Sequence, residues 1–220
     1  MMKILITGAN RGIGLELTRQ LKTGGHEVFA ACRQSSAELH ETGAHIREGI
    51  DVARDDAIER LHQALGGVTL DLIINCAGVL EGVSLDNLDF DSIVKQFQIN
   101  AVGPLRVIKG IERCIVDGGK VAMITSRMGS IADNTSGGSY GYRMSKAALN
   151  IASVSLAHDL APRNIAVAII HPGYVQTEMT GFRGNLTPEE SARGIIERIE
   201  ELNMSNSGTF WHQSGEVLPW

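Results

Sequence analysis

The chain has 220 residues, of which 43% are hydrophobic and 20% charged, and its formal net charge is −5. This composition is typical of a globular protein with a substantial core, and the acidic balance gives no support to a nucleic-acid partner. No segment approaches the ~20 apolar residues of a membrane span, and residues 1–7 lack the pattern of a secretory signal. We therefore expect a cytoplasmic protein without a membrane partner.

Short apolar runs alternate with stretches of helical periodicity. Strands are expected at 3–7, 27–32, 45–50, 70–75, 120–125 and 164–170, with a weaker one near 208–211. Helices are expected at 12–23, 53–65, 89–101, 103–116, 142–160 and 188–202, the last with Thr187 as N-cap and Pro188 as first residue. This alternation predicts an α/β Rossmann fold in a single domain, 1–220, with a doubly wound parallel sheet and helices on both faces.

Glycines directly follow the first expected strand and open the first helix. A strand, a glycine turn and a helix N-terminus together form an anion site, because free backbone N–H groups point at the ligand. Glycine also permits close approach of a pyrophosphate. The spacing here is G-x-x-x-G-x-G, which differs from the G-x-G-x-x-G fingerprint. The predicted dinucleotide-binding residues of this turn are Gly8, Asn10, Arg11, Gly12, Ile13 and Gly14.

Tyr142 and Lys146 are four positions apart at the start of an expected helix, so they share one helical face. A free phenol titrates near ~10, and a nearby cation lowers that pKa toward the working range of a proton donor and acceptor. Taken alone, the pair reads more readily as a half-buried tyrosine beside a solvated lysine.

Further polar and glycine-containing segments follow other expected strands, where parallel sheets bind their ligands. They are Asn75-Cys76-Ala77-Gly78, Asn100, Thr125-Ser126 and Pro172-Gly173-Tyr174-Val175-Gln176-Thr177. With the glycine turn and the Tyr142–Lys146 pair, their order and spacing resemble the short-chain dehydrogenase/reductase family from Lys3 to the C-terminus. The ending Trp211-His212-Gln213-Ser214-Gly215-Glu216-Val217-Leu218-Pro219-Trp220 resembles its C-factor/sniffer-type carbonyl reductase branch.

The resemblance implies catalytic roles for four residues. Tyr142 would pass a proton to the carbonyl oxygen, and Lys146 would hold the nicotinamide ribose and lower the pKa of Tyr142. Ser126 would donate a hydrogen bond to the substrate oxygen, and Asn100 would support a water that links Lys146 to solvent. Outside this constellation, Ser126 reads as a loop hydroxyl and Asn100 as an amide inside a helix.

The resemblance also implies further cofactor contacts. Asp51 would reach the adenine, although it could instead cap the next helix. Cys76 stands where the family usually has asparagine, a small replacement with little expected loss. The implied cofactor-binding residues beyond the glycine turn are Arg33, Asp51, Val52, Asn75, Ala77, Gly78, Tyr142, Lys146, Pro172, Gly173, Val175 and Thr177.

The end of the second strand predicts the cofactor. An acid there would select NAD, whereas an arginine suits the 2′-phosphate of NADP. Residues 28–33 carry no carboxylate, and Arg33, with Arg11 as a second candidate, can pair with phosphate. We expect NADP(H) to be favoured over NAD(H), the alternative being two solvated arginines. Cys32, Cys76 and Cys114 read as reduced thiols, and no spacing of cysteines or histidines suggests a metal site.

The substrate side is less clearly defined by the sequence. Tyr142 follows Ser126 by 16 positions, longer than the family's usual gap, and the loop at 136–138 would absorb the difference. Tyr140 is a rival phenol, but no cation follows it four residues later. Tyr174, Met179 and Phe182 could line the cleft or pack against the helix at 188–202.

The leading interpretation is an NADP(H)-dependent carbonyl reductase that transfers a hydride to or from a small carbonyl or alcohol substrate. A dinucleotide-binding signalling protein of C-factor type, with little turnover, is the alternative from another class. A sugar epimerase or dehydratase is a third, against which the glycine spacing and the short C-terminal region count. The helices at 89–116 and 142–160 carry apolar residues on more than one face. In the family that the chain resembles such helices pair across two-fold axes, which implies a homodimer or homotetramer; the alternative is deep burial within the monomer.

Overall fold

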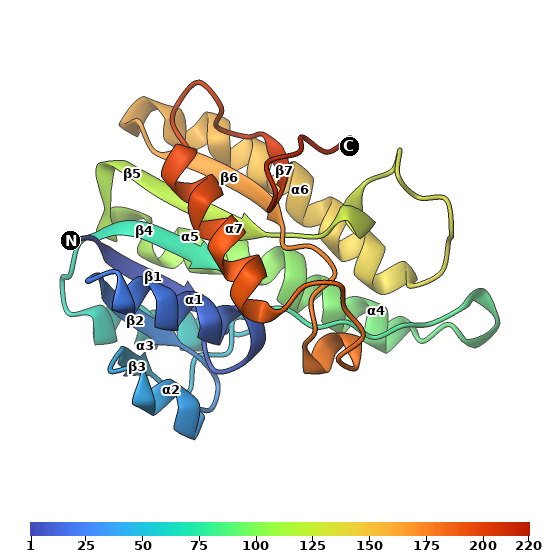
Figure 1. The fold of residues 1–220 in the computed structure, drawn as a ribbon, viewed down its shortest axis with the longest axis horizontal. Helices are drawn as coiled ribbons and strands as arrows, with labels where there is room; N and C mark the ends of the chain where they lie inside the picture. The colour runs from blue at the N-terminus through green and yellow to red at the C-terminus, as the bar shows by residue number, and fades with distance from the viewer.

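The computed structural model describes residues 1–220 and contains one seven-stranded sheet in which all pairings of neighbouring strands are parallel (Figure 1). The strand order is β3-β2-β1-β4-β5-β6-β7, so the chain reverses direction of travel across the sheet between β3 and β4. The strands are β1 (Lys3–Thr7), β2 (Glu27–Ala31), β3 (His45–Arg47), β4 (Leu70–Asn75), β5 (Ile115–Ile124), β6 (Ala166–His171) and β7 (Phe210–His212).

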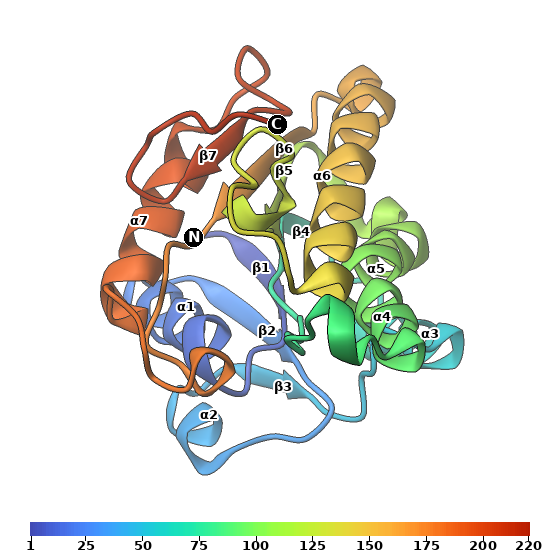
Figure 2. The same cartoon turned by 90° about the vertical axis from the view of Figure 1, so that its right-hand side faces the viewer.

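Helices cover both faces of this sheet (Figure 2). Helices α1 and α7 lie together on one face, and α3, α5 and α6 cover the other. The helices are α1 (Gly12–Thr23), α2 (Ala37–Glu41), α3 (Asp55–Leu65), α4 (Phe90–Phe97), α5 (Gly103–Ile111), α6 (Tyr140–Leu160) and α7 (Pro188–Glu201). The predicted Rossmann-type α/β fold with a doubly wound parallel sheet is confirmed.

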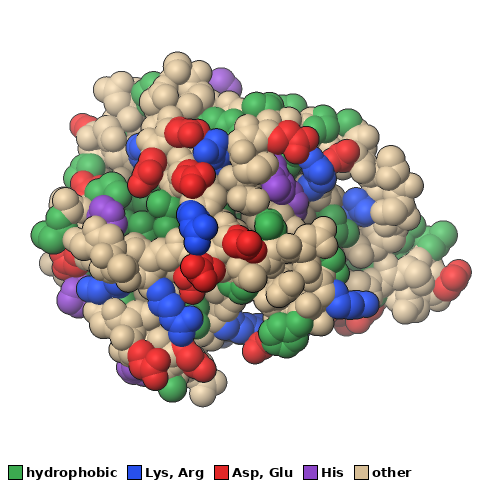
Figure 3. All heavy atoms as spheres, in the orientation of Figure 1, with side chains coloured by type: hydrophobic (Ala, Val, Ile, Leu, Met, Phe, Trp, Pro, Cys, Tyr) green, Lys and Arg blue, Asp and Glu red, His purple; other side chains and the backbone are tan.

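Two apolar cores follow from the alternation of side chains along each strand. On β1, Ile4 and Ile6 pack into a cluster with α1 and α7, while Leu5 points into a second cluster with α3, α5 and α6. All three side chains are fully buried. Strands covered on both faces therefore read as continuous apolar runs, which is why their positions are visible in the sequence. On the outside, acidic and basic side chains are interspersed over the face seen in Figure 3.

The segment around β5 corrects one sequence expectation. The helix expected at 103–116 ends at Ile111, a short 3-10 turn follows, and β5 begins at Ile115 rather than at residue 120. Its pairing with β4 shifts register between Leu70 and Leu72, opposite a stretch that contains Gly118 at φ +81°. This bulge accommodates extra residues in β5. In the sequence, the apolar residues at the start of β5 resemble the end of a helix.

Other boundaries also differ from the expected ones. Helix α2 was not expected; it is five residues long and is capped by Ser36, whose hydroxyl accepts a hydrogen bond from the Leu39 N–H. Strand β3 ends at Arg47 instead of residue 50, and α6 begins at Tyr140, two residues early. Between α4 and α5 the chain makes a π-helical turn over Gln98–Val102. None of the helices is long and apolar enough to cross a membrane.

Candidate active site

The glycine turn between β1 and α1 is fixed by close backbone contacts. A Cβ on Gly8, which has φ +69°, would lie 2.7 Å from the Ala77 Cα, and a Cβ on Gly14 would lie 2.2 Å from the Gly8 carbonyl oxygen. The Thr7 hydroxyl accepts hydrogen bonds from the N–H groups of Cys76 and Ala77 at 3.2 and 3.3 Å. The turn is thus locked against the end of β4, and the N-terminus of α1 faces the carboxyl edge of the sheet.

A cleft of about 800 Å³ runs along this carboxyl edge. It joins the glycine turn to the ends of β2 and β4, the start of α6 and the segment after β6. Most of the predicted cofactor-binding residues line it, namely Gly8, Asn10, Arg11, Gly12, Ile13, Gly14, Arg33, Asp51, Val52, Ala77, Gly78, Tyr142, Lys146, Pro172 and Thr177.

Three predicted cofactor residues do not line the cleft. Asn75 is buried at the end of β4, where its side-chain amide contacts the Met123 sulfur at 3.5 Å. Val175 is buried, and a Cβ on Gly173 would lie 2.5 Å from the Leu186 side chain. Their surroundings indicate that they shape the backbone behind the cleft.

The end of β2 offers a free cation to the cleft. Arg33 forms no ion pair and no side-chain hydrogen bond. Two acids that follow β3 are occupied elsewhere, since Glu48 accepts from the N–H and hydroxyl of Ser35 and Asp51 accepts from the Ala53 N–H at 3.0 Å. This second contact is a local turn bond before α3, whose N-cap residue is Arg54, so Asp51 does not cap that helix.

A second arginine of the cleft is already paired. Arg11 forms an ion pair with Glu178, and both side chains are about three-fifths exposed. This contact links the glycine turn to the segment after β6, across the mouth of the cleft. Glu178, Met179 and Phe182 all line the cleft, and the sequence assigned no cofactor role to them. Nothing in the sequence around Glu178, five residues after Gly173, indicates that it pairs with a residue 167 positions earlier.

The predicted catalytic side chains are buried together at the start of α6 and the end of β5. Tyr142, Lys146 and Ser126 are each no more than 7% exposed. The Lys146 Nζ lies 5.8 Å from the centre of the Tyr142 ring and donates a 2.9 Å hydrogen bond to the Ile124 carbonyl. The turn after Ser126 packs directly on α6, because a Cβ on Gly129 would lie 2.7 Å from the Lys146 carbonyl carbon.

Burial dominates the electrostatics of the pair. It raises the pKa of Tyr142 to about 12, although a hydrogen bond with Ser126 acts in the opposite direction. Burial also lowers the pKa of Lys146 to about 8. The net shift of the Tyr142 pKa is therefore upward in this structure, because removing the phenolate from water is its largest cause.

Asn100 lies in the π-helical turn and is completely buried. Its side-chain amide donates to the Val79 carbonyl at 2.8 Å and to the Ser145 hydroxyl at 3.0 Å, and its oxygen accepts from the Val79 N–H at 2.8 Å. A Cβ on Gly78 would lie 3.3 Å from that oxygen and 3.8 Å from the Lys146 Nζ. Asn100 therefore ties the strand-end segment to α6 beside Lys146, a contact typical of π-turns at functional sites.

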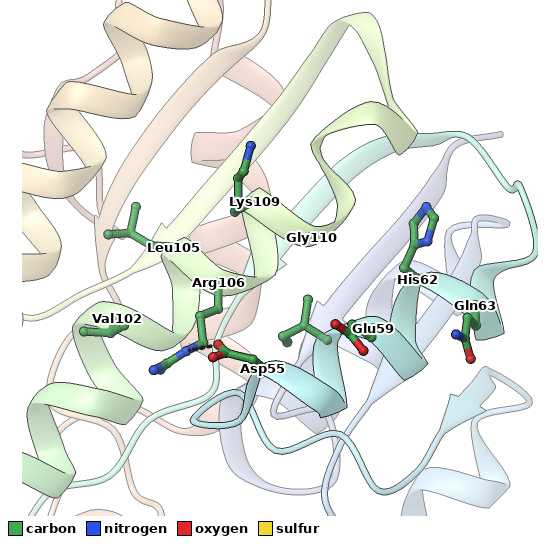
Figure 4. Close-up of a pocket in the computed structure, with 10 residues that line it drawn as sticks. Asp55, Glu59, His62, Gln63, Val102, Leu105, Arg106, Lys109 and Gly110 are labelled. Atoms are coloured by element: carbon green, nitrogen blue, oxygen red, sulfur yellow. Dashed lines mark hydrogen bonds and ion pairs between the residues drawn. The ribbon is translucent and has the colours of Figure 1, made fainter.

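A second hollow of about 550 Å³ lies between α3 and α5 (Figure 4). A 2.6 Å ion pair joins Arg106 to Asp55 across it. The helices approach closely at Gly110, where a Cβ would lie 2.1 Å from the Ile58 side chain. None of the predicted site residues lines this hollow, and the structure brings no three His, Cys, Asp or Glu side chains together as a metal site.

The parallel sheet, the glycine turn and the cleft at the carboxyl edge define a Rossmann-like α/β protein. A family model described as short chain dehydrogenase matches residues 2–185. The 1-hydroxy-2-glutathionyl-2-methyl-3-butene dehydrogenase of Rhodococcus sp. (strain AD45) is 40% identical over 226 residues, covering 100% of both chains. The C-signal protein of Myxococcus xanthus is 44% identical over 155 residues, which are 69% of this chain and 93% of that protein.

Solved structures agree with this assignment. The carbonyl reductase Sniffer of D. melanogaster superposes with a TM-score of 0.91 and 29% identity, covering 100% of both chains. An NADPH-bound carbonyl reductase from chicken fatty liver superposes with a TM-score of 0.90 and 27% identity, covering 100% of this chain and 99% of that one. The chain belongs to the short-chain dehydrogenase family and is an oxidoreductase of the C-factor/sniffer type, as the sequence resemblance indicated.

Proposed function

We propose that this chain is an NADP(H)-dependent carbonyl reductase in which Tyr142 is the general acid and base. The observation that carries the proposal is the joint burial of Tyr142, Ser126 and Lys146, of which Tyr142 and Lys146 line the cleft. Three polar side chains in an apolar setting are costly unless they serve each other or a ligand. We further propose that the one domain, 1–220, holds both the cofactor site and the catalytic groups.

The cleft has the features that a dinucleotide needs. Its glycine turn leaves no room for side chains at Gly8 and Gly14, and the N-terminus of α1 offers free N–H groups to a pyrophosphate. The unpaired Arg33 suits a 2′-phosphate, and the two acids that line the cleft already have partners, Asp51 with the Ala53 N–H and Glu178 with Arg11. The NADPH-bound relative from chicken liver supports the same preference. We therefore favour NADP(H) over NAD(H).

The raised pKa of Tyr142 sets the resting protonation state of the proposed proton donor. A phenol with a pKa of about 12 is protonated at neutral pH, so it is ready to donate to a carbonyl oxygen. The bound nicotinamide would supply the hydride to the carbonyl carbon. The Ser126 hydroxyl would donate a second hydrogen bond to the same oxygen as negative charge develops on it. The Lys146 ammonium would bind the ribose hydroxyls and stabilise the phenolate that remains.

The substrate class is proposed from the relatives. The Rhodococcus protein is named for an alcohol that carries a glutathionyl group, and the two reductases act on carbonyls. We propose a small carbonyl or alcohol, and a turnover screen should include aldehydes, ketones, quinones and an alcohol bearing a glutathione thioether. The relative named C-signal supports a second candidate, a dinucleotide-binding signalling protein. NADPH binding without turnover of any of these compounds would favour that candidate.

The decisive experiment replaces Tyr142 by phenylalanine, which removes only the phenolic oxygen. Carbonyl reduction should fall by about 10²–10⁴-fold, the usual contribution of a general acid, while NADPH affinity stays unchanged. Tyr140→Phe is the matched control, because this phenol lies in the same helical turn and should be dispensable. Near-normal turnover in Tyr142→Phe, with loss in Tyr140→Phe, would show that the catalytic phenol is misassigned.

A further inference from the structure

The loop between Ser126 and Tyr142 adopts a strained backbone just before α6. Gly137, Gly138 and Ser139 are consecutive residues with φ values of +64°, +65° and +48°. Ser139 has a side chain, and a non-glycine residue in this left-handed region costs on the order of 1–3 kcal/mol. Such a conformation persists only where the surroundings fix it, so this loop must be held by specific contacts.

Arg143, the residue after Tyr142, supplies most of these contacts. Its Nε donates to the carbonyls of Gly137 and Gly138, both at 3.2 Å, and its Nη2 donates to the Ser136 hydroxyl at 2.8 Å. Its Nη1 makes a longer 3.5 Å contact with the Met128 carbonyl, in the turn that follows Ser126. Arg143 has no carboxylate partner, so its whole guanidinium is committed to this loop.

The loop that Arg143 holds, residues 127–139, connects Ser126 to the start of α6. It leaves the sheet after β5 and returns at the start of α6, so its two ends carry Ser126 and Tyr142 (Figures 1 and 2). The Ser139 N–H donates to the Val83 carbonyl at 2.9 Å, which joins the loop to the segment that follows β4. Apart from its end at Tyr142, the loop does not line the cofactor cleft. The loop therefore carries two of the proposed reacting groups at its ends, while the rest of it lies outside the cofactor cleft.

We propose that Arg143 is a positioning residue that sets substrate selectivity by holding residues 133–139 as a wall of the carbonyl site. The inference rests on the proposed function, because it needs Ser126 and Tyr142 to be the groups that face the substrate. A planar guanidinium donates hydrogen bonds in several fixed directions at once. A lysine at this position is a single point charge that could form only some of the hydrogen bonds that Arg143 makes to the loop. Releasing the wall misplaces the substrate without touching the cofactor.

The test compares Arg143→Ala and Arg143→Lys with a matched arginine at the opposite edge of the sheet. Arg163 also donates to backbone carbonyls, those of Glu112 and Ile115, and pairs with Asp117. Arg163→Ala therefore removes a similar set of hydrogen bonds far from the site. For each protein, kcat and KM are measured with NADPH and with one small aldehyde and one bulky aromatic ketone, beside the Kd of NADPH and hydrogen exchange of residues 127–139.

In Arg143→Ala, kcat/KM for the small aldehyde should fall by roughly 10-fold or more, because displacements near 1 Å have effects of up to ~10²-fold. The ketone-to-aldehyde ratio of kcat/KM should rise by about 3-fold or more, within the range that pocket contacts control. Exchange of the loop amides should speed up, and the Kd of NADPH should not change. Arg143→Lys should recover part of the selectivity, and Arg163→Ala should leave the ratio unchanged.

Two results would overturn the inference. An unchanged selectivity ratio in an active Arg143→Ala protein would show that the loop is no wall, whether or not its amides exchange faster. An equal loss for both substrates together with weaker NADPH binding would show a general structural role. Absence of turnover with any carbonyl in the unmodified protein would instead refute the proposed function itself, so the two failures are distinguishable.

Discussion

His171 should couple folding stability to pH in the mildly acidic range. It ends β6 next to Pro172, and its ring centroid lies 5.2 Å from that of His212. Its Nδ1 is buried and has no hydrogen-bond partner. Burial, together with the positive charges of His212, Arg127 and Lys146, lowers the pKa of His171 to about 3. The folded protein therefore holds this imidazole neutral.

The direction in which the free energy of unfolding changes with pH follows from comparing the folded and unfolded chains. In the unfolded chain the imidazole has its ordinary pKa of 6.5, so between pH 6.5 and about 3 only the unfolded state binds the proton. The free energy of unfolding must fall as the pH drops through this window. At pH 5 the unfolded state gains RT ln(1 + 10^1.5), which is about 2 kcal/mol relative to pH 8.

Urea unfolding at pH 8 and pH 5 measures this loss. His171→Gln should reduce the difference in unfolding free energy between the two pH values by about 2 kcal/mol, whatever its own stability at pH 8. Carboxylates and the remaining histidines titrate in both proteins, so their contribution cancels in the comparison. His62→Gln, on the exposed surface of α3, is the control and should leave the difference unchanged. The same pH dependence in His171→Gln as in the unmodified protein would refute the reasoning.

Three further outcomes test the cofactor, the proton transfer and the assembly. Arg33→Asp should weaken NADPH at least tenfold relative to NADH, because a charge-assisted hydrogen bond contributes about 1.5–3 kcal/mol; equal affinity of the unmodified protein for both cofactors would contradict this. Alcohol oxidation should still accelerate at about pH 10, since Tyr142 must first lose a proton that burial retains; a plateau near pH 7 would oppose it. Light scattering should give at least twice the chain mass of 23.7 kDa, because Phe90 and Val94 on α4 and Ile151 on α6 are exposed apolar side chains; a monomer at micromolar concentration would refute it.

The parts of the fold that the sequence predicted well depend on local physics. The turn from β1 into α1 is marked by glycines whose missing side chains are required within the turn itself and against β4. The start of α7 is marked by Thr187, which caps the Glu190 N–H at 3.2 Å, and by Pro188 in the first turn, as expected. In both places the residues that mark the element in the sequence also form the contacts that fix it in the structure. Their spacing alone is therefore enough to locate the element.

The parts that the sequence did not predict depend on contacts between distant segments. The early start of β5 is set by its pairing with β4 through a bulge, which no local pattern encodes. Glu178 pairs with Arg11 across the cleft mouth, and Arg143 satisfies carbonyls of a loop whose conformation is not visible in its composition. Arginine and glutamate are ordinary residues for the protein surface, and only the three-dimensional structure shows which groups these side chains contact.

The pKa of Tyr142 shows that the sequence is also limited in predicting the chemistry of the site. Helical spacing correctly places Lys146 near the phenol, but spacing does not reveal that both groups are almost completely buried. Burial acts on the two residues in opposite directions, retaining the proton of Tyr142 and loosening that of Lys146. A phenol with this pKa carries its proton at neutral pH. On the proposed role of Tyr142, the resting site is therefore ready to donate a proton to a carbonyl oxygen, whereas alcohol oxidation first requires the phenol to lose that proton.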